Sequence, residues 1–426
     1  MAQLTESQAI LSEFSTLVKE EITLSGQFFS ELFSADEMLV RLERLFHFVS
    51  PGNYEGWQAE DALNSPIIKS LPFYGNARFR LAVTRQIKQA PINLRPLLGI
   101  SKSFNARAGA GFLTGLLYLF RYTGKTVYEN EAYILFQRLK HESLARPRGM
   151  AWGENYDWQR AGLFLPKGTP NMLATVTAAQ ALLQYYRTFN DLNALNLALN
   201  AADFILDEMI LFEDAQYAGL RFAIKRPYKS LEASLAGAAF LSQIMQELSP
   251  VRQAAVNNLI LKITRYATLN IAPTTGWTEI QQGLVRRNPA GQRQMAYWID
   301  CLIQVGHYLE TDEFDWLIQL TLCFYFAKFF PDLSLAKARE KSQLPLQCET
   351  LAQDLFLLKR LFQYNLLENN PTLSRILVQC QKNLAQFQDE QGYFYYQQSG
   401  QSSRKVCYIS PCQSQMFHVL STYLLK

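Results

Sequence analysis

The chain has 426 residues, of which 49% are apolar and 18% charged, and it carries a formal net charge of +4. This composition is typical of a globular protein whose core needs no disulfide or metal to fold, and so mild a charge argues against a nucleic-acid partner. The first twenty residues carry acids and no apolar block, and no run approaches the roughly 18 apolar residues of a membrane helix, so we expect a cytoplasmic protein without a membrane span.

The cysteines and histidines show no metal-binding pattern. No two cysteines form a C-x-x-C pair, and the four histidines are scattered along the chain. We therefore expect buried free thiols, no metal and no cofactor. The residues concerned are Cys301, Cys323, Cys348, Cys380, Cys407, Cys412, His47, His141, His307 and His418.

Helical periodicity runs through most of the chain. Apolar residues at i, i+3 and i+4 spacing predict helices, and several of them begin with a capping signal, such as Asn105 and the dipeptides Thr169–Pro170 and Ser249–Pro250. The predicted starts lie near 105, 128, 170, 192, 230, 250, 292, 312, 349, 370 and 412.

Short and long connections alternate between these helices. The long segments are 145–169, 211–229, 271–291, 330–348 and 389–411. A helix after a long segment therefore recurs with a period of roughly 60 residues, which indicates a repeat of helical hairpins.

The two sets of helices differ in composition. Helices after long segments are rich in small residues, as in AGAGFLTG, LATVTAAQA and LEASLAGAAF, which suits a crowded inner ring. We predict an all-α (α/α)6 toroid of about six hairpins, with 1–90 supplying helices that close the ring and 91–426 forming the toroid, both parts of one continuous domain. An open solenoid would need polar caps, and the terminal MFHVLSTYLL is too apolar to be one.

In such a ring the long segments gather on one face and form a funnel. They carry 15 Lys and Arg against 9 Asp and Glu, so positive charge is concentrated there and favours an anionic ligand. Aromatic side chains also gather in these segments, where they either stack on sugar rings or anchor the loops.

One segment resembles a known family. The run GMAWGENYDWQRAGLFLPKGTPNMLATVTAAQALL is similar to the motif of VpsJ-like bacterial polysaccharide biosynthesis proteins, and LLGISKSFNARAGAGFLTGLLYLFRYTGK and DEQGYFYYQ resemble two further segments of that family. The resemblance spans about 95–425 and implies a six-hairpin toroid associated with glycans.

The chain also departs from the family pattern. The third inner helix opens with Ser230, Leu231, Glu232 and Ala233 in place of a histidine and an asparagine, and WIDCLIQVGHY lacks the family's histidine. After GYFYY, Lys405, Tyr408, Gln413 and Met416 match the family, but its arginine, tryptophan and glycine are missing. These departures leave open whether the chemistry is altered or lost.

Asp157 is the leading candidate for a general acid, since apolar neighbours would raise its pKa. Its alternative role is structural, holding the loop through Arg160 or backbone N–H groups. The remaining catalytic candidates are Glu154, Glu232, Asp300 and Tyr408. The substrate-binding candidates are Trp152, Trp158, Arg160, Asn171, Arg226, Trp277, Glu279, Arg286, Trp298 and Lys405.

Three functions fit these residues. The first is an enzyme that hydrolyses an acidic glycan or its precursor, or cleaves it by elimination. The second is a catalytically silent glycan-binding or scaffold protein of a polysaccharide biosynthesis complex. The third is a sugar 2-epimerase, against which the sparse histidines argue. The expected partners are an acidic oligosaccharide or sugar phosphate, and polysaccharide biosynthesis proteins.

Overall fold

The structure is a computed structural model that describes residues 32–160, 162–224, 230–269, 271–272, 276–279, 288–289, 291–330, 346–364, 366, 371–399 and 402–425. Its inner helices are α6 (Ala106–Thr123), α8 (Met172–Phe189), α10 (Leu231–Ile244), α12 (Gln292–Leu309), α15 (Cys348–Gln363) and α17 (Gln415–Thr422). Its outer helices are α3 (Ala35–Val49), α7 (Thr126–His141), α9 (Leu192–Phe204), α11 (Pro250–Thr268), α13 (Asp315–Phe329) and α16 (Pro371–Phe387).

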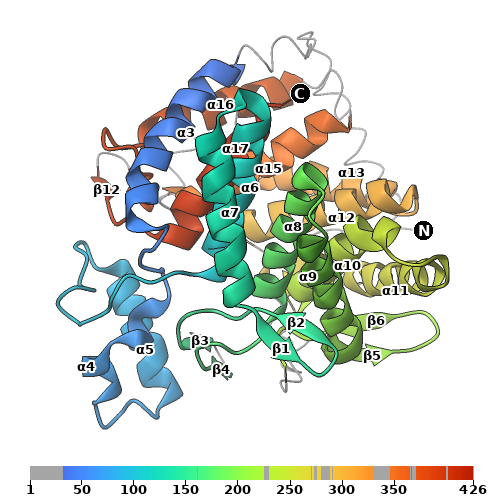
Figure 1. Cartoon of the computed structure of the whole chain (residues 1–426), viewed down its shortest axis with the longest axis horizontal. Helices are drawn as coiled ribbons and strands as arrows, with labels where there is room; N and C mark the ends of the chain where they lie inside the picture. The colour runs from blue at the N-terminus through green and yellow to red at the C-terminus, as the bar shows by residue number, and fades with distance from the viewer. Residues whose placement is uncertain are drawn as a thin grey trace.

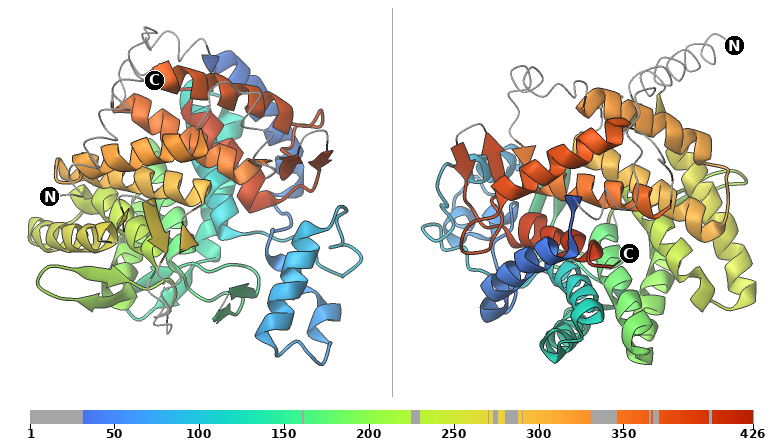
Figure 2. Two further views of the ribbon diagram at one scale, coloured as in Figure 1. Left: turned by 180° about the vertical axis from the view of Figure 1, so that it is seen from behind. Right: turned by 90° about the horizontal axis from the view of Figure 1, so that it is seen from above.

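The inner helices form a closed ring. Each packs against the next along the chain, and the last, α17, packs against the first, α6. The predicted α/α toroid is thereby confirmed, and the colours of the ribbon follow one another around the molecule (Figures 1 and 2). Each inner helix from α6 to α15 packs on the outer helix that follows it, whereas α17 packs on α3 from the N-terminal part.

Capping side chains and small residues explain the ring, and the predicted cap at Asn105 is one of these caps. The side chains of Asn105, Asn171 and Ser230 accept hydrogen bonds from backbone N–H groups in the first turns of α6, α8 and α10. At the seam between α6 and α17, a methyl group on Gly115 would lie 2.4 Å from the ring of Phe417. A glycine at this position therefore lets the two helices approach closely enough to close the ring.

Short antiparallel hairpins occupy the long connections, a feature that the sequence did not predict. They pair β1 (Leu144–Arg146) with β2 (Gly149–Ala151), β3 (Trp158–Arg160) with β4 (Leu163–Leu165), and β5 (Ile210–Glu213) with β6 (Ala218–Leu220). Two three-stranded sheets follow: β7 (Ile271–Ala272), β8 (Gly276–Glu279) and β9 (Asn288–Pro289), then β10 (Leu346–Gln347), β11 (Gln397–Ser399) and β12 (Ser402–Arg404).

Residues 53–100 form a small lobe beside the ring, with α4 (Pro66–Lys69) and α5 (Ala77–Gln89) next to the β3–β4 hairpin (Figure 1). The lobe has its own small core around Leu63, Ile68 and Ile87. Fully buried Arg95 ties it to the ring by pairing with Asp61 (2.6 Å) and donating to the Tyr408 hydroxyl (3.0 Å). The domain boundaries at 90 and 91 stay a prediction.

None of the helices in the described ranges combines the length and apolarity that crossing a bilayer requires. The six cysteines are free thiols, all of them buried except Cys407, which is partly exposed.

Candidate functional site

A cluster of charged side chains lies where the inner helices begin. Arg107, Glu232, Arg293 and Glu349 are each the second residue of an inner helix, in α6, α10, α12 and α15. Glu154, from the loop between β2 and β3, joins them through Arg107. We call these five residues the funnel floor.

Ion pairs link the funnel floor from helix to helix. The guanidinium of Arg293 contacts Glu349 Oε1 at 3.2 Å and Glu232 Oε1 at 3.7 Å, so it bridges the helices on either side of α12. Arg107 donates to Glu154 Oε1 at 3.3 Å, and Asn105 donates to Glu154 Oε2 at 2.8 Å.

The same side chains interact across the ring. Burial alone would lower the pKa of Arg107, but the charges of Glu154, Glu232 and Glu349 outweigh it, and the pKa is raised. Helix α6 has α8 and α17 as ring neighbours, so Glu232 and Glu349 act on Arg107 from non-adjacent helices. The funnel floor therefore lies around the axis of the toroid.

Arg107 and Arg293 lie at helix N-termini, where a positive side chain is unfavourable. A helix N-terminus carries partial positive charge, which stabilises acids such as Glu232 and Glu349 and disfavours cations. Arg107 and Arg293 nevertheless occupy first turns, where Glu154, Glu232 and Glu349 compensate them. Positions that break a local preference in this way are expected at functional sites.

Glu232 is the least satisfied member of the funnel floor. Its side chain is only 4% exposed, its Oε1 is loosely held by Arg293 at 3.7 Å, and its Oε2 has no hydrogen-bond partner among the described residues. A buried carboxylate oxygen without a donor is costly. A ligand that donates a hydrogen bond would therefore stabilise this site.

The carboxylates of Glu232 and Glu349 are close enough to act on one bond. Both contact the same guanidinium, so they lie no more than roughly 10 Å apart, within the range that separates the two carboxylates of glycosidases. Glu349 is the more accessible of the two, with 23% of its side chain exposed.

Asp157 lies away from the funnel floor, in a hydrogen-bond network with the lobe. Its carboxylate accepts from the Lys167 N–H (2.8 Å), the Tyr74 hydroxyl (2.9 Å) and the Lys69 ammonium (2.9 Å), while its own N–H donates to Asn64. Burial would raise the pKa of Asp157, but these bonds outweigh it and hold the pKa below its usual value. The expectation of a raised pKa was wrong, because every oxygen of this carboxylate is hydrogen-bonded in its ionised form.

Three predicted ligand contacts are core or capping residues instead. Trp152 and Trp298 are fully buried, and Trp152 Nε1 donates to the Leu139 carbonyl at 2.9 Å. Asn171 is buried as the N-cap of α8. None of the three side chains exposes a surface on which a sugar could lie. We therefore correct the prediction that they bind the substrate: Trp152 and Trp298 belong to the core, and Asn171 caps a helix.

Two predicted catalytic residues have other partners. Asp300 pairs with Arg360 at 2.9 Å and accepts from Gln304 at 2.6 Å, about two turns along α12 from Arg293. Tyr408 is buried against Arg95, and burial raises the pKa of its hydroxyl although Arg95 opposes the shift. Both residues are engaged within the fold, which leaves Glu154 and Glu232 as the catalytic candidates at the funnel floor.

The other predicted binding residues lie in the long connections. Trp158 is partly buried, and the guanidinium of Arg160 lies 4.5 Å from the centre of its ring. Lys405 is exposed, with its ammonium 5.2 Å from the Tyr395 ring. Trp277 and Glu279 belong to β8, where the structure describes only the backbone, and Arg226 and Arg286 lie outside the described residues.

The sequence analysis missed Arg107, Arg293 and Glu349. A signal for them exists, because each lies at the predicted start of an inner helix or within two residues after it. Aligning the periods of roughly 60 residues would have placed them at one level of the ring.

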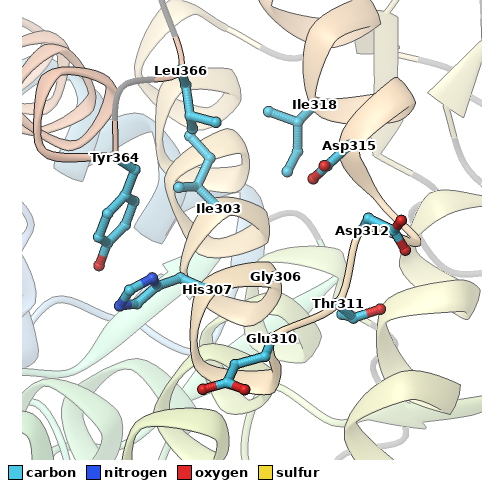
Figure 3. Close-up of a pocket in the computed structure, with 10 residues that line it drawn as sticks. All are labelled: Ile303, Gly306, His307, Glu310, Thr311, Asp312, Asp315, Ile318, Tyr364 and Leu366. Carbon is cyan, nitrogen blue, oxygen red and sulfur yellow. The ribbon is translucent and has the colours of Figure 1, made fainter.

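A separate pocket of about 440 Å³ lies at the other end of the ring, where α12 and α15 end and α13 begins (Figure 3). His307 stacks on Tyr364 on one side of it, at 4.1 Å between ring centres, and exposed Asp312 and Asp315 lie on the other. Exposed Glu310 lies below His307 in this view. No residue predicted to act in catalysis or binding lines this pocket.

A scan against protein-family models gave no match, and a search of curated proteins gave none either. The fold is similar to that of solved carbohydrate-processing enzymes. One is a cellobiose 2-epimerase from Spirochaeta thermophila, with 14% identity and a TM-score of 0.54 over 75% of this chain and 86% of that one. Another is a GH76 α-mannanase from Bacteroides thetaiotaomicron, with 11% identity and a TM-score of 0.53 over 76% and 88% of the chains.

A glycosyl hydrolase of family 88 from Bacteroides vulgatus has 11% identity and a TM-score of 0.50, over 75% of this chain and 92% of that one. At such identities these likenesses establish the toroid fold, and they leave the function of this chain to be argued from its own residues.

Proposed function

We propose that this protein binds a glycan in its funnel and cleaves it, by hydrolysis or elimination, with an acidic glycan or glycan precursor as its substrate. The observation that carries the proposal is the funnel floor, where Glu232 has an unpartnered oxygen beside the partly exposed Glu349. Polysaccharide biosynthesis proteins are the partners that the sequence resemblance suggests, and a cytoplasmic location is part of the same proposal.

The chemistry follows from the two carboxylates. In hydrolysis, one carboxyl group protonates the leaving oxygen while the other activates water or attacks the sugar. Glu232 and the partly exposed Glu349 are the two carboxyl groups that the funnel floor offers for these tasks. Acidic groups of the glycan would contact Arg160 and Lys405 in the long connections, since the funnel floor itself is not basic.

A specific observation favours the catalytically silent alternative. Arg293 contacts both Glu232 and Glu349, so each carboxylate already has a cationic partner within the fold. A glycan-binding or scaffold protein would use the same funnel floor to hold a sugar without cleaving it.

A sugar 2-epimerase is the weaker candidate, despite the likeness to a cellobiose 2-epimerase. The four histidines lie on α3, at the last residue of α7, in the last turn of α12 and on α17. None of them is the second residue of an inner helix, where four residues of the funnel floor lie, and His418 of α17 packs against the ring of Phe356. The funnel floor therefore lacks the histidine bases on which that reaction commonly relies.

The proposal is tested by incubating the protein with a panel of oligouronides and neutral oligosaccharides. Reducing ends report hydrolysis, and the absorbance of unsaturated sugars reports elimination. We expect one substrate to be cleaved, and Glu232→Gln and Glu349→Gln each to reduce the rate by at least about 100-fold.

The matched control is Glu313→Gln, which removes a carboxylate that pairs with Arg265 on the outer layer. It should leave the rate unchanged. Binding without cleavage of any substrate would favour the silent alternative, and neither binding nor cleavage would refute the proposal.

A further inference from the structure

The charge of the funnel floor differs from that of the long connections. Its acids are Glu154, Glu232 and Glu349, and its bases are Arg107 and Arg293. Lys88 and Glu60 of the lobe pair with each other at 2.5 Å and add no net charge. Among the described residues, the funnel floor therefore has one more negative charge than positive.

The funnel floor offers a ligand both a hydrogen-bond acceptor and hydrogen-bond donors. Glu232 offers an acceptor without a partner. Arg107 uses one N–H on Glu154, and a guanidinium has five, so donors remain on a side chain that is 26% exposed. The ligand must therefore donate to Glu232 and accept from an arginine within a few ångströms.

A sugar hydroxyl meets both requirements, because it donates one hydrogen bond and accepts others. The end of a glutamate side chain turns easily about its last torsion, so small rotations bring the Glu232 carboxylate to such a hydroxyl. Its bond to the ionised carboxylate would be charge-assisted and short.

A uronate carboxylate meets only the second requirement, accepting a hydrogen bond from an arginine. It accepts from the arginines but has no donor for Glu232, and it brings a negative charge beside three carboxylates. Like charges at such distances disfavour each other strongly. Those arginines are also already paired, so little attraction remains to offset the repulsion.

We propose that the funnel floor binds an uncharged sugar ring of the glycan, with one hydroxyl donating to Glu232 and accepting from Arg107 or Arg293. Acidic units of the glycan lie farther out, near the long connections. This inference rests on the proposed function, and it specifies which unit of the glycan occupies the deepest position.

The test uses matched monosaccharide pairs: glucose with glucuronate, galactose with galacturonate, and mannose with mannuronate. Calorimetric titrations at constant ionic strength give the affinity of each. In the pair that binds, we expect the neutral sugar to bind at least about tenfold more tightly than its uronate. Glu232→Gln should lower the affinity for the neutral sugar by about tenfold or more. It should also reduce the difference in affinity between the neutral sugar and its uronate, since it removes a negative charge that repels the uronate.

Glu313→Gln is again the control and should change neither affinity. Glutamine has nearly the same shape as glutamate, so the Glu232→Gln variant should unfold at the same temperature as the native protein. A uronate that binds as tightly as its neutral partner would overturn this inference and leave the proposed function standing. Failure of every sugar, monosaccharide or oligosaccharide, to bind would overturn both.

Discussion

Asp157 has the sequence context of a catalytic acid and the surroundings of a structural one. Two of its hydrogen-bond donors, Lys69 and Tyr74, come from the lobe more than 80 residues earlier in the chain. A sequence pattern within one segment does not identify hydrogen-bond partners that lie so far away in the chain. Glu232, in contrast, lies in the first turn of a helix whose start near residue 230 the sequence predicts.

We predict that Asp157→Asn destabilises the protein by about 1–3 kcal/mol at pH 7 and leaves glycan binding unchanged. The lowered pKa of Asp157 means that its stabilising effect is present above the ordinary aspartate pKa and is lost as the carboxylate is protonated at lower pH. The difference between variant and native protein should therefore shrink in acid, as measured by denaturant unfolding at several pH values.

Asp203→Asn is the control, because Asp203 forms an exposed pair with Arg252 and should change stability by no more than about 0.5 kcal/mol. Loss of binding by a fully stable Asp157→Asn variant would contradict the structural role of this residue.

Helix α15 contains a buried acid between the inner and outer layers. Burial raises the pKa of Asp354 to about 7, although hydrogen bonds from Tyr325 of α13 (2.5 Å) and Gln292 of α12 (2.8 Å) oppose the shift. Between about pH 4 and 7 the folded chain holds a proton here that the unfolded chain has released. Asp354 therefore makes the protein less stable as pH rises through this range.

We predict that Asp354→Asn removes this pH dependence, since asparagine stays neutral. The fall in unfolding free energy between about pH 4 and 7 should become smaller, by a few kcal/mol at most, because one pKa unit corresponds to about 1.4 kcal/mol. Denaturant unfolding at four pH values measures it. An unchanged slope would mean that Asp354 is ionised throughout.

The helices of this chain are long enough to be predicted from its sequence, whereas its strands are too short. The inner helix α12 spans 18 residues, long enough for its apolar face to recur several times. A strand such as β3 has three residues, which is too short for a pattern of alternation to be distinguished from a loop. The position of the hairpins depends on their packing over the ring.

At the scale of the whole molecule, the seam between α6 and α17 decides whether the ring closes. We predict that Gly115→Ala destabilises the protein by about 1–3 kcal/mol, because its methyl group would overlap the ring of Phe417. Thermal and denaturant unfolding give the magnitude, and affinity for the glycan should fall as the seam is displaced.

Gly52→Ala serves as the control, since a methyl group there meets no atom within 4 Å. Equal stability of the two variants would show that the seam adjusts without strain. The sequence predicts a seam from the apolar C-terminal helix, but the pairing of Gly115 with Phe417 depends on the final register of two helices far apart in the chain.

That seam also sets an order of events during biosynthesis. The helices that meet at it are separated by roughly 300 residues, so their contact forms late and has a high loop-closure cost. A ribosome has to translate nearly the whole chain before α17 can cover α6, and until then the apolar face of α6 stays open to other molecules. Nascent chains stalled before residue 415 should therefore bind chaperones, and release of the final helix should end that association.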